Sequence, residues 1–229
     1  MTNHPSMKRT FIGAIICLLS VAMLAFSGSA SQPQNPAGQN QATQDAIALR
    51  EAFRRGGLRE VAKLKGHYVG EYDPHWDLLL SLETLTKDSA AVIVGRFTKK
   101  LDARIPDSRV IFTDYQVAVE ELIKGDIKQS ETVVTLPGGR IVFEDGTSAE
   151  QLTPYFDQPR IGRAYTLFLM REKAVPGVFF LFGGPEGMFD IEDSAGVRSH
   201  GRADDPAAVE TKGMSRELFL RKVREQERK

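Results

Sequence analysis

The chain has 229 residues, enough for one domain with appended segments, and 41% hydrophobic with 26% charged residues is a globular composition that excludes disorder throughout. Its 30 basic and 30 acidic residues cancel, which argues against binding to nucleic acid or to an anionic membrane surface. The single cysteine, Cys17, lies in the N-terminal apolar run, so the remainder of the chain can form no disulfide and must be stabilised by its core.

The first 30 residues have the three-part layout of a secretory signal peptide. Lys8 and Arg9 form the basic region, an apolar run covers Phe11–Phe26, and small residues precede the expected cleavage after Ala30. The start could equally be Met7, and retention of the segment as an anchor stays open. We expect a secreted or periplasmic protein with no integral membrane segment after cleavage.

Two segments separate this signal from the expected β domain. Residues 31–44 are rich in Gln, Asn, Ser, Pro and Gly without periodicity, which predicts a flexible tether. Residues 45–89 form a helical lead-in, beginning with short helices over 45–55 and 58–65 that Gly56-Gly57 separates.

A third helix is expected over Trp76–Lys87. Asp73 can cap its free amides, and Pro74 suits a first helical turn. Its apolar stripe comprises Leu78, Leu82 and Leu85. A stripe this wide needs a packing partner, and the sheet is the obvious candidate.

The β domain is expected over residues 90–198, around one long strand, Arg109–Gly125. Apolar or β-branched side chains alternate with polar ones along it, as in a half-buried strand. Shorter strands of the same character surround it, which predicts an antiparallel sheet curled into a β-barrel. They cover residues 90–98, 132–136, 140–143, 164–170, 178–182 and 188–191.

The remaining segment, residues 199–229, is expected to be a loop followed by a C-terminal helix. Residues 199–213 are polar and lack periodicity. Ser215 can cap a helix over Arg216–Gln226, whose apolar side chains would dock on the domain.

The densest set of possible metal ligands is His67, Glu71, Asp73, His75 and Asp77. Imidazole and carboxylate groups both bind zinc or another divalent ion, so we take His67, His75, Glu71 and Asp73 as candidate ligands. Their spacing matches no known zinc motif, and the alternative is a polar loop before a helix.

Other kinds of site have weaker support. The sequence has no Gly-X-Ser-X-Gly or Ser-X-X-Lys frame for a nucleophile. Aromatic residues such as Tyr115, Phe179 and Phe182 could stack nucleic-acid bases, but with thirteen Phe to place they are more simply core residues.

Four segments carry a resemblance to known proteins. Ala90–Arg96, the Glu-Leu-Ile-Lys-Gly end of the long strand, Gly162–Leu169 and Gly183–Phe189 resemble a group of exported bacterial proteins of uncharacterised function. More distantly, their order is similar to the netrin-like module of tissue inhibitors of metalloproteinases, which implies an oligonucleotide/oligosaccharide-binding (OB) type of barrel. Those inhibitors need an N-terminal cysteine and disulfides, which the mature chain would lack.

The sequence therefore favours an exported, non-catalytic binding module of the cell envelope. We expect its partner to be another extracytoplasmic protein, met through loops at one end of the barrel, and we expect no cofactor and no nucleic acid. Two alternatives stay open: a metal-dependent hydrolase that uses the His67/His75 region with a divalent metal, and a peptidase inhibitor-like module.

Overall fold

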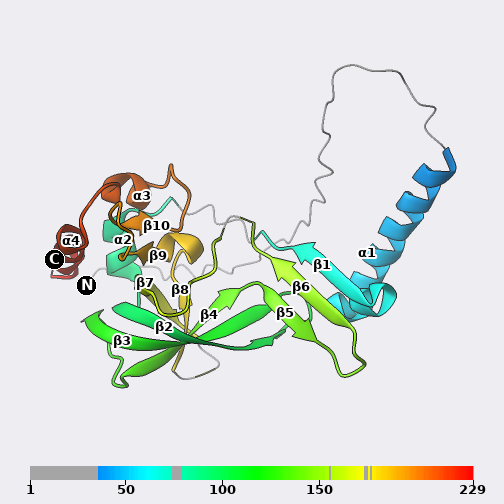
Figure 1. Cartoon of the computed structure of the whole chain (residues 1–229), viewed down its shortest axis with the longest axis horizontal. Coiled ribbons are helices and arrows are strands. Elements are labelled where there is room, and N and C mark those ends of the chain that lie inside the picture. Colours follow the sequence, from blue (N-terminus) through cyan, green and yellow to red (C-terminus); the bar gives the residue numbers. More distant parts are fainter. Residues whose placement is uncertain (1–35, 74–78, 155, 173–174, 176, 229) are drawn as a thin grey trace, which may run out of the picture. The chain divides into compact units, whose positions relative to one another are not determined.

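The computed structural model describes residues 36–73, 79–154, 156–172, 175 and 177–228, and Ala42–Lys229 form one compact unit. The described part is mainly β, with a seven-stranded sheet, a three-stranded sheet and four α-helices (Figure 1). This confirms the expected mainly β class with flanking helices. No helix among the described residues is long and apolar enough to cross a membrane.

Seven strands form the larger sheet, in the order β10-β9-β7-β2-β3-β4-β8. β8 also pairs with β7, so β7, β2, β3, β4 and β8 form a closed ring of pairings. Every pairing in it is antiparallel except that of β4 with β8. The strands are β2 (Ala91–Arg104), β3 (Phe112–Lys124), β4 (Glu131–Pro137), β7 (Ala164–Arg171), β8 (Val178–Leu181), β9 (Met188–Asp190) and β10 (Arg198–Ser199).

The ring encloses the first hydrophobic core. In β3, the strand expected from the alternating pattern, Tyr115 and Val117 face this core, whereas Gln116 between them stays partly exposed. The ring of Phe97 packs edge-on against Tyr115 and Tyr165, with centroids 5.5 and 5.4 Å apart. The structure thus confirms both the strand and the buried face that the period-2 pattern predicts.

A second core lies on the opposite face of β2 and β7. In β7, Leu167 joins the first core while Phe168 joins the second, which explains why the strand is apolar on both faces. The second core is covered by α2 (Leu82–Asp88), α3 (Pro206–Thr211) and α4 (Arg216–Glu227). The expected C-terminal helix is confirmed, and the Ser215 hydroxyl accepts a hydrogen bond from Leu218 N at 3.3 Å.

The smaller sheet has the order β1-β6-β5, with β1 (His67–Glu71), β5 (Gly139–Val142) and β6 (Ser148–Leu152). β1 and β6 are parallel, and β6 and β5 are antiparallel. Ala149 of β6 forms a third, smaller core with Leu58 and Ala62 of α1 (Pro36–Lys65).

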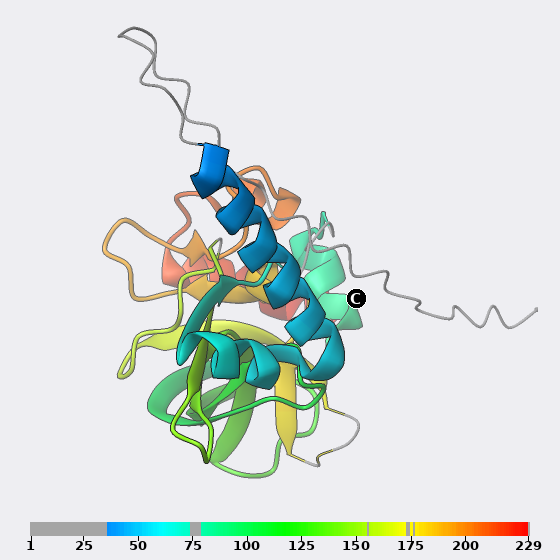
Figure 2. The same cartoon turned by 90° about the vertical axis from the view of Figure 1, so that its right-hand side faces the viewer.

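The structure of α1 confirms the expected break at Gly56-Gly57 but not the expected irregular tether. The helix bends at Gly56 and Gly57, and Gly57 has a φ of 68° (Figure 2). A side chain at Gly57 would collide with Ser108 O, which accepts a hydrogen bond from Leu58 N at 2.8 Å. From Pro36 onward the expected irregular tether is helical instead, because Ala and Gln favour helix and extend the segment that follows. The expected signal peptide, residues 1–30, lies outside the described residues.

The third expected helix begins later than its sequence indicated. Residues 79–81 are not helical, and α2 starts at Leu82, where the Ser81 hydroxyl accepts a hydrogen bond from Thr84 N at 3.1 Å. A continuous helix over Trp76–Lys87 is therefore wrong. The helix begins after Ser81 instead, because the Ser81 hydroxyl accepts a hydrogen bond from a first-turn amide. Residues 74–78, which include Pro74, Trp76, Asp77 and Leu78, lie outside the described residues.

The pattern missed four short elements: β1, β6, β10 and α3. β1 and β6 are five residues each and carry polar or charged side chains, and their stability comes from pairing with each other and from the helix packed behind them. α3 lies inside the expected polar loop of residues 199–213, and has Pro206 in its first turn. Elements this short depend on tertiary contacts more than on their own periodicity.

Candidate functional site

One pocket opens beside the ring, and we call it the aromatic pocket. It has a volume of about 110 Å³ and lies where β3, β4 and β8 meet the 3-10 helix η1 (Gly184–Gly187). Its lining is apolar or aromatic apart from the hydroxyls of a threonine and a tyrosine. The lining residues are Tyr72, Phe112, Thr135, Leu136, Pro137, Phe156, Phe180, Leu181, Gly184 and Pro185.

Strand register places several lining residues on the outer face of the ring. Phe112 is opposite Pro137, and Thr135 is opposite Phe180. Their chain neighbours, such as Leu136 and Phe179, face the inner core, so the alternation leaves Phe112 and Phe180 on the other side. These two rings pack edge to face with centroids 5.7 Å apart and form one wall of the pocket.

A polar group borders this wall. Arg104 Nε donates to Asp114 Oδ2 at 3.1 Å, and its Nη2 donates to Thr135 Oγ1 at 3.2 Å. The Thr135 hydroxyl in turn donates to Asp114. Because Thr135 also lines the pocket, the edge of the apolar wall carries fixed donors and acceptors.

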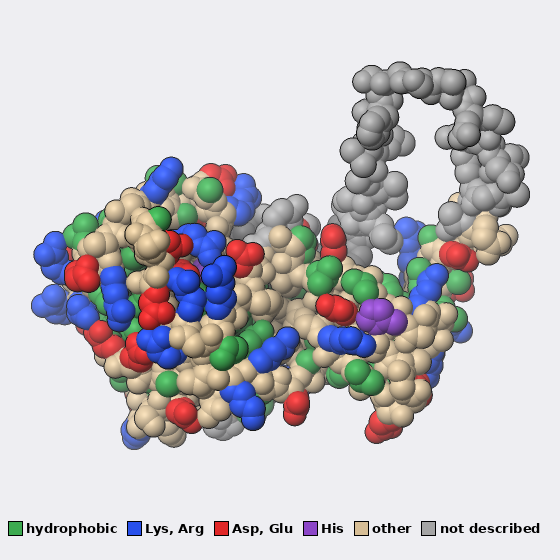
Figure 3. All heavy atoms as spheres, in the orientation of Figure 1, with side chains coloured by type: hydrophobic (Ala, Val, Ile, Leu, Met, Phe, Trp, Pro, Cys, Tyr) green, Lys and Arg blue, Asp and Glu red, His purple; other side chains and the backbone are tan. Residues whose placement is uncertain are grey.

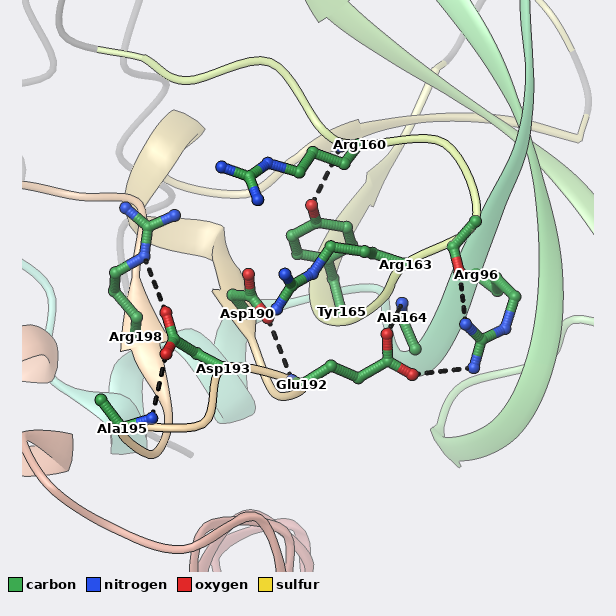
Figure 4. A network of polar contacts seen from close by, with 11 residues as sticks. Arg96, Arg160, Arg163, Ala164, Tyr165, Asp190, Glu192, Asp193, Ala195 and Arg198 are labelled. Carbon is green, nitrogen blue, oxygen red and sulfur yellow. Dashed lines mark hydrogen bonds and ion pairs between the residues drawn. The ribbon is translucent and has the colours of Figure 1, made fainter.

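A second polar group ties β2 and the residue before β7 to the end of β9 and the chain that follows it (Figure 4). Arg96 Nη2 lies 2.9 Å from Glu192 Oε1, and its Nε lies 2.6 Å from Glu120 Oε1. Arg163 Nη2 lies 2.8 Å from Asp190 Oδ1, and this hydrogen bond raises the pKa of Arg163. Each of these guanidinium groups is compensated by a carboxylate, so the group is suited to holding strands together.

Charges of both signs also mix over the surface. On the face shown in Figure 3, Lys and Arg side chains are interspersed with Asp and Glu. The adjacent acids Glu120 and Glu121 of β3 illustrate this, since Glu120 pairs with Arg96 and Glu121 pairs with Arg224 of α4, Nη2 to Oε1 at 2.7 Å. Their different partners agree with the rule that adjacent side chains of a strand point to opposite faces.

His200 is buried, with 8% of its surface exposed. Its ring packs edge-on against Tyr165 at 5.6 Å and against Phe156 at 6.4 Å between centroids. Burial lowers the pKa of His200 to about 4, so the imidazole is neutral at ordinary pH.

The candidate metal ligands do not converge in the described residues. His67 and Glu71 occupy exposed positions at opposite ends of β1, about 13 Å apart along the strand at ~3.3 Å per residue. His67 Nδ1 lies 2.7 Å from Ser148 Oγ of β6. Asp73 is exposed two residues after β1, and His75 lies outside the described residues. Among the described residues, no group of three or more His, Cys, Asp and Glu could hold a metal ion.

Sequence reasoning missed the residues that form the pocket. Tyr115 and Phe179 are core residues, as the simpler interpretation expected, with 3% and 2% of their surfaces exposed. Phe180, next to Phe179, faces the pocket instead. The available signal was the phase of the alternation, which places Phe112 on the same face as Asp114 rather than with the core.

Comparison with models of protein families and with curated protein sequences finds no match for this chain. The fold and the site therefore define its class. It is a mainly β protein with a closed ring of five paired strands, covered by helices on one side, that carries a small aromatic pocket where β3, β4 and β8 meet η1.

Proposed function

We propose that the protein is a non-catalytic binding module that acts outside the cytoplasm. Its aromatic pocket would receive one apolar side chain from an extended segment of another extracytoplasmic protein. The observation that carries this proposal is the pocket itself, in which Phe112 and Phe180 form an apolar wall outside the core. Export rests on the signal-like layout of the first 30 residues.

We also propose that the ring is a barrel of the OB type. The support is its closed order, β2-β3-β4-β8-β7, with the third and fourth members parallel and the other neighbours antiparallel. Barrels of this type bind extended ligands over their second and third strands. Here those strands are β3 and β4, and both contribute to the pocket.

The size of the pocket favours a protein partner over a small molecule. Pockets for drug-sized ligands have volumes of roughly 300–1,000 Å³, and a cavity of about 150 Å³ accepts one benzene ring. A volume of about 110 Å³ therefore suits one aliphatic side chain. Arg104, Asp114 and Thr135 lie beside it and can bind the polar backbone that flanks such a side chain.

The lining also suits binding better than hydrolysis. General acid–base catalysis needs a titratable side chain within hydrogen-bond reach of the substrate. The pocket lining offers two hydroxyls, from Tyr72 and Thr135, and contains no carboxylate, imidazole or thiol. The proposed module needs no cofactor, and its melting temperature should stay the same after treatment with a chelator.

Site-specific photo-crosslinking in living cells tests the proposal. A benzoylphenylalanine replaces Phe180 in the full chain, and in a matched control it replaces Val142 of β5, which is 63% exposed and outside the pocket. We expect a discrete protein adduct at position 180 and none at 142. Excess wild-type protein should compete the adduct away, whereas a folded Phe112→Asp competitor should not.

Failure of this pattern would overturn the proposal. An absence of adducts at position 180, equal adducts at both positions, or equal competition by Phe112→Asp would each show that the pocket is not the binding site. Thermal melting of each variant establishes that it is folded before it is used.

A further inference from the structure

Two carboxylates are buried together behind η1. Glu186 belongs to η1 and has 2% of its surface exposed, and Asp205, which precedes α3, has 1% exposed. Both contact Gly201: a Cβ atom there would lie 2.6 Å from Asp205 Oδ2 and 2.9 Å from Glu186 Cγ. Only glycine leaves room for the two acids at this point.

Leu80 connects the two elements that carry these acids. Its amide donates to Glu186 Oε2 at 3.1 Å, and its carbonyl accepts from Ala207 N of α3 at 3.0 Å. The contact therefore joins η1, the residues before α2 and the first turn of α3. The stability of this contact depends on the free-energy cost of burying the Glu186 carboxyl group.

Three oxygens of this pair have no hydrogen-bond partner among the described residues. They are Glu186 Oε1 and both carboxyl oxygens of Asp205, whose side chain does not cap α3 although it holds the capping position. A buried carboxylate without partners is strongly disfavoured in its charged form. The pair must be neutralised by a proton or by a cation.

The surroundings favour the proton. Among the described residues, no third acidic, histidine or cysteine side chain completes a metal-binding group here. Arg202, whose charge acts on both acids, lies 2.9 Å from Asp204, and both members of this ion pair are more than half exposed. A protonated carboxyl group needs no further ligands.

We propose that Glu186 and Asp205 form a proton-operated latch. With Glu186 protonated, the latch fastens η1 and Leu80 to α3, and loss of this proton loosens the contact. The proposal does not depend on what the aromatic pocket binds.

The electrostatic environment agrees with this assignment. The pKa of Glu186 is raised to about 7, mainly by burial. The charge of Asp205 also raises this pKa, whereas the hydrogen bond from the Leu80 amide and the charge of Arg202 lower it. Burial also raises the pKa of Asp205. His200 beside Gly201 is neutral above about pH 4.

Two further acids near the latch, among the residues that the structure describes, are paired with basic side chains. Glu210 of α3 lies 2.7 Å from Lys222 Nζ of α4, and hydrogen bonding to Arg202 lowers the pKa of Asp204. Glu186, whose pKa is raised to about 7, therefore changes charge near neutral pH.

The sign of the effect follows from linkage. When the contact opens, Glu186 regains its ordinary pKa of 4.5, whereas in the closed form its pKa is about 7. The closed form holds more protons between these values, so the opening equilibrium constant should rise by up to about tenfold per pH unit from 4.5 to 7 and stay level above.

Amide hydrogen exchange, measured residue by residue on the full chain between pH 5 and 8, tests the latch. After correction for intrinsic rates, protection of the Leu80 and Ala207 amides should fall by at least tenfold from pH 5 to 7 and then level off. Glu186→Gln keeps an acceptor for Leu80 N but cannot titrate, so its protection should vary less than threefold. The Phe182 amide, which donates to Phe168 O at 2.8 Å, serves as an internal control with constant protection.

Asp205→Asn provides a second test if Glu186→Gln does not fold. Removing the neighbouring negative charge should move the loss of protection to lower pH. A flat profile in the wild type, or equal slopes in the wild type and Glu186→Gln, would overturn the proposal. So would stoichiometric binding of calcium, magnesium or zinc that restores protection at pH 8, because a cation would then neutralise the pair.

Discussion

Pro185 and Glu186 are consecutive residues of η1 that serve different parts of the molecule. Pro185 lines the aromatic pocket, whereas the carboxyl group of Glu186 is buried beside Asp205 and accepts a hydrogen bond from Leu80 N. A movement of η1 must therefore displace both Pro185 in the pocket and Glu186 beside Asp205. This connects the proposed latch to the proposed binding site.

The connection predicts that binding in the pocket depends on pH. Because protonated Glu186 fixes η1, the yield of the adduct at position 180 should be severalfold higher at pH 5.5 than at pH 7.5. In the Glu186→Gln background the two yields should be equal. Equal yields in the wild type, with the adduct still formed, would show that the latch and the pocket are independent.

The contribution of His200 to stability depends on pH in the opposite sense to that of Glu186. Burial lowers its pKa from 6.5 to about 4, so its stabilising effect is present above pH 6.5 and is lost as the pH falls through 4. In a Glu186→Gln background, His200→Phe should reduce the loss of unfolding free energy between pH 7 and 4.5 by about 2 kcal/mol. Urea unfolding at the two pH values measures the difference, and parallel losses in both proteins would contradict the assignment.

Asp190 should matter more than a neighbouring exposed ion pair. Its side chain is 4% exposed and binds Arg163, whereas the Arg198 side chain is 48% exposed and lies 3.5 Å from Asp157. Asp190→Ala leaves a partly buried guanidinium without its partner, which should cost about 3 kcal/mol of unfolding free energy. Arg198→Ala should cost less than about 1 kcal/mol. Equal costs in denaturant unfolding would refute this ranking.

Gly187 should tolerate alanine poorly for reasons of space. A Cβ atom there would lie 2.2 Å from Phe182 O, so the turn between β8 and β9 must shift. We expect Gly187→Ala to lower the unfolding free energy by about 2–3 kcal/mol. Gly66, with a φ of 72° and open space around it, is the matched control, and Gly66→Ala should cost about 1 kcal/mol. A Gly187→Ala protein as stable as the wild type would exclude the close approach.

The N-terminal segment makes a prediction about processing. If the first 30 residues direct export, protein purified from the extracytoplasmic fraction should begin at Ser31. Mass spectrometry of the intact protein measures this directly. Replacing Lys8 and Arg9 by Asn should leave unprocessed protein in the cytoplasm, and a full-length N-terminus in the exported fraction would support the retained-anchor alternative.

Much of the fold could be predicted because long elements carry their own periodicity. The alternation through Thr113, Tyr115 and Val117 identified β3 and its buried face. Apolar side chains on both faces of β7 are typical of a central strand, and β7 pairs with β2 on one side and β9 on the other. Local cap chemistry located the last helix at Ser215, although the same reasoning placed the start of α2 too early, at a competing Asp-Pro pair.

The tertiary structure decided the elements and sites whose parts are distant in the sequence. β1 is a short strand of mixed character, and it exists because β6, some 80 residues later, supplies its hydrogen bonds. Likewise, Phe112 and Phe180 meet only because β4 lies between β3 and β8. Local propensity contains no information about such pairings.

The sequence by itself thus determined the mainly β class, the long strands and the buried face of each, because side-chain alternation is a local property of the backbone. The tertiary structure alone decided the order of the strands, the aromatic pocket and the burial of Glu186 beside Asp205. The pKa of Glu186 shows the physical reason. Glu186 is an ordinary acid in the sequence, and its pKa rises to about 7 mainly because residues from distant parts of the chain desolvate it, with the charge of Asp205 acting in the same direction.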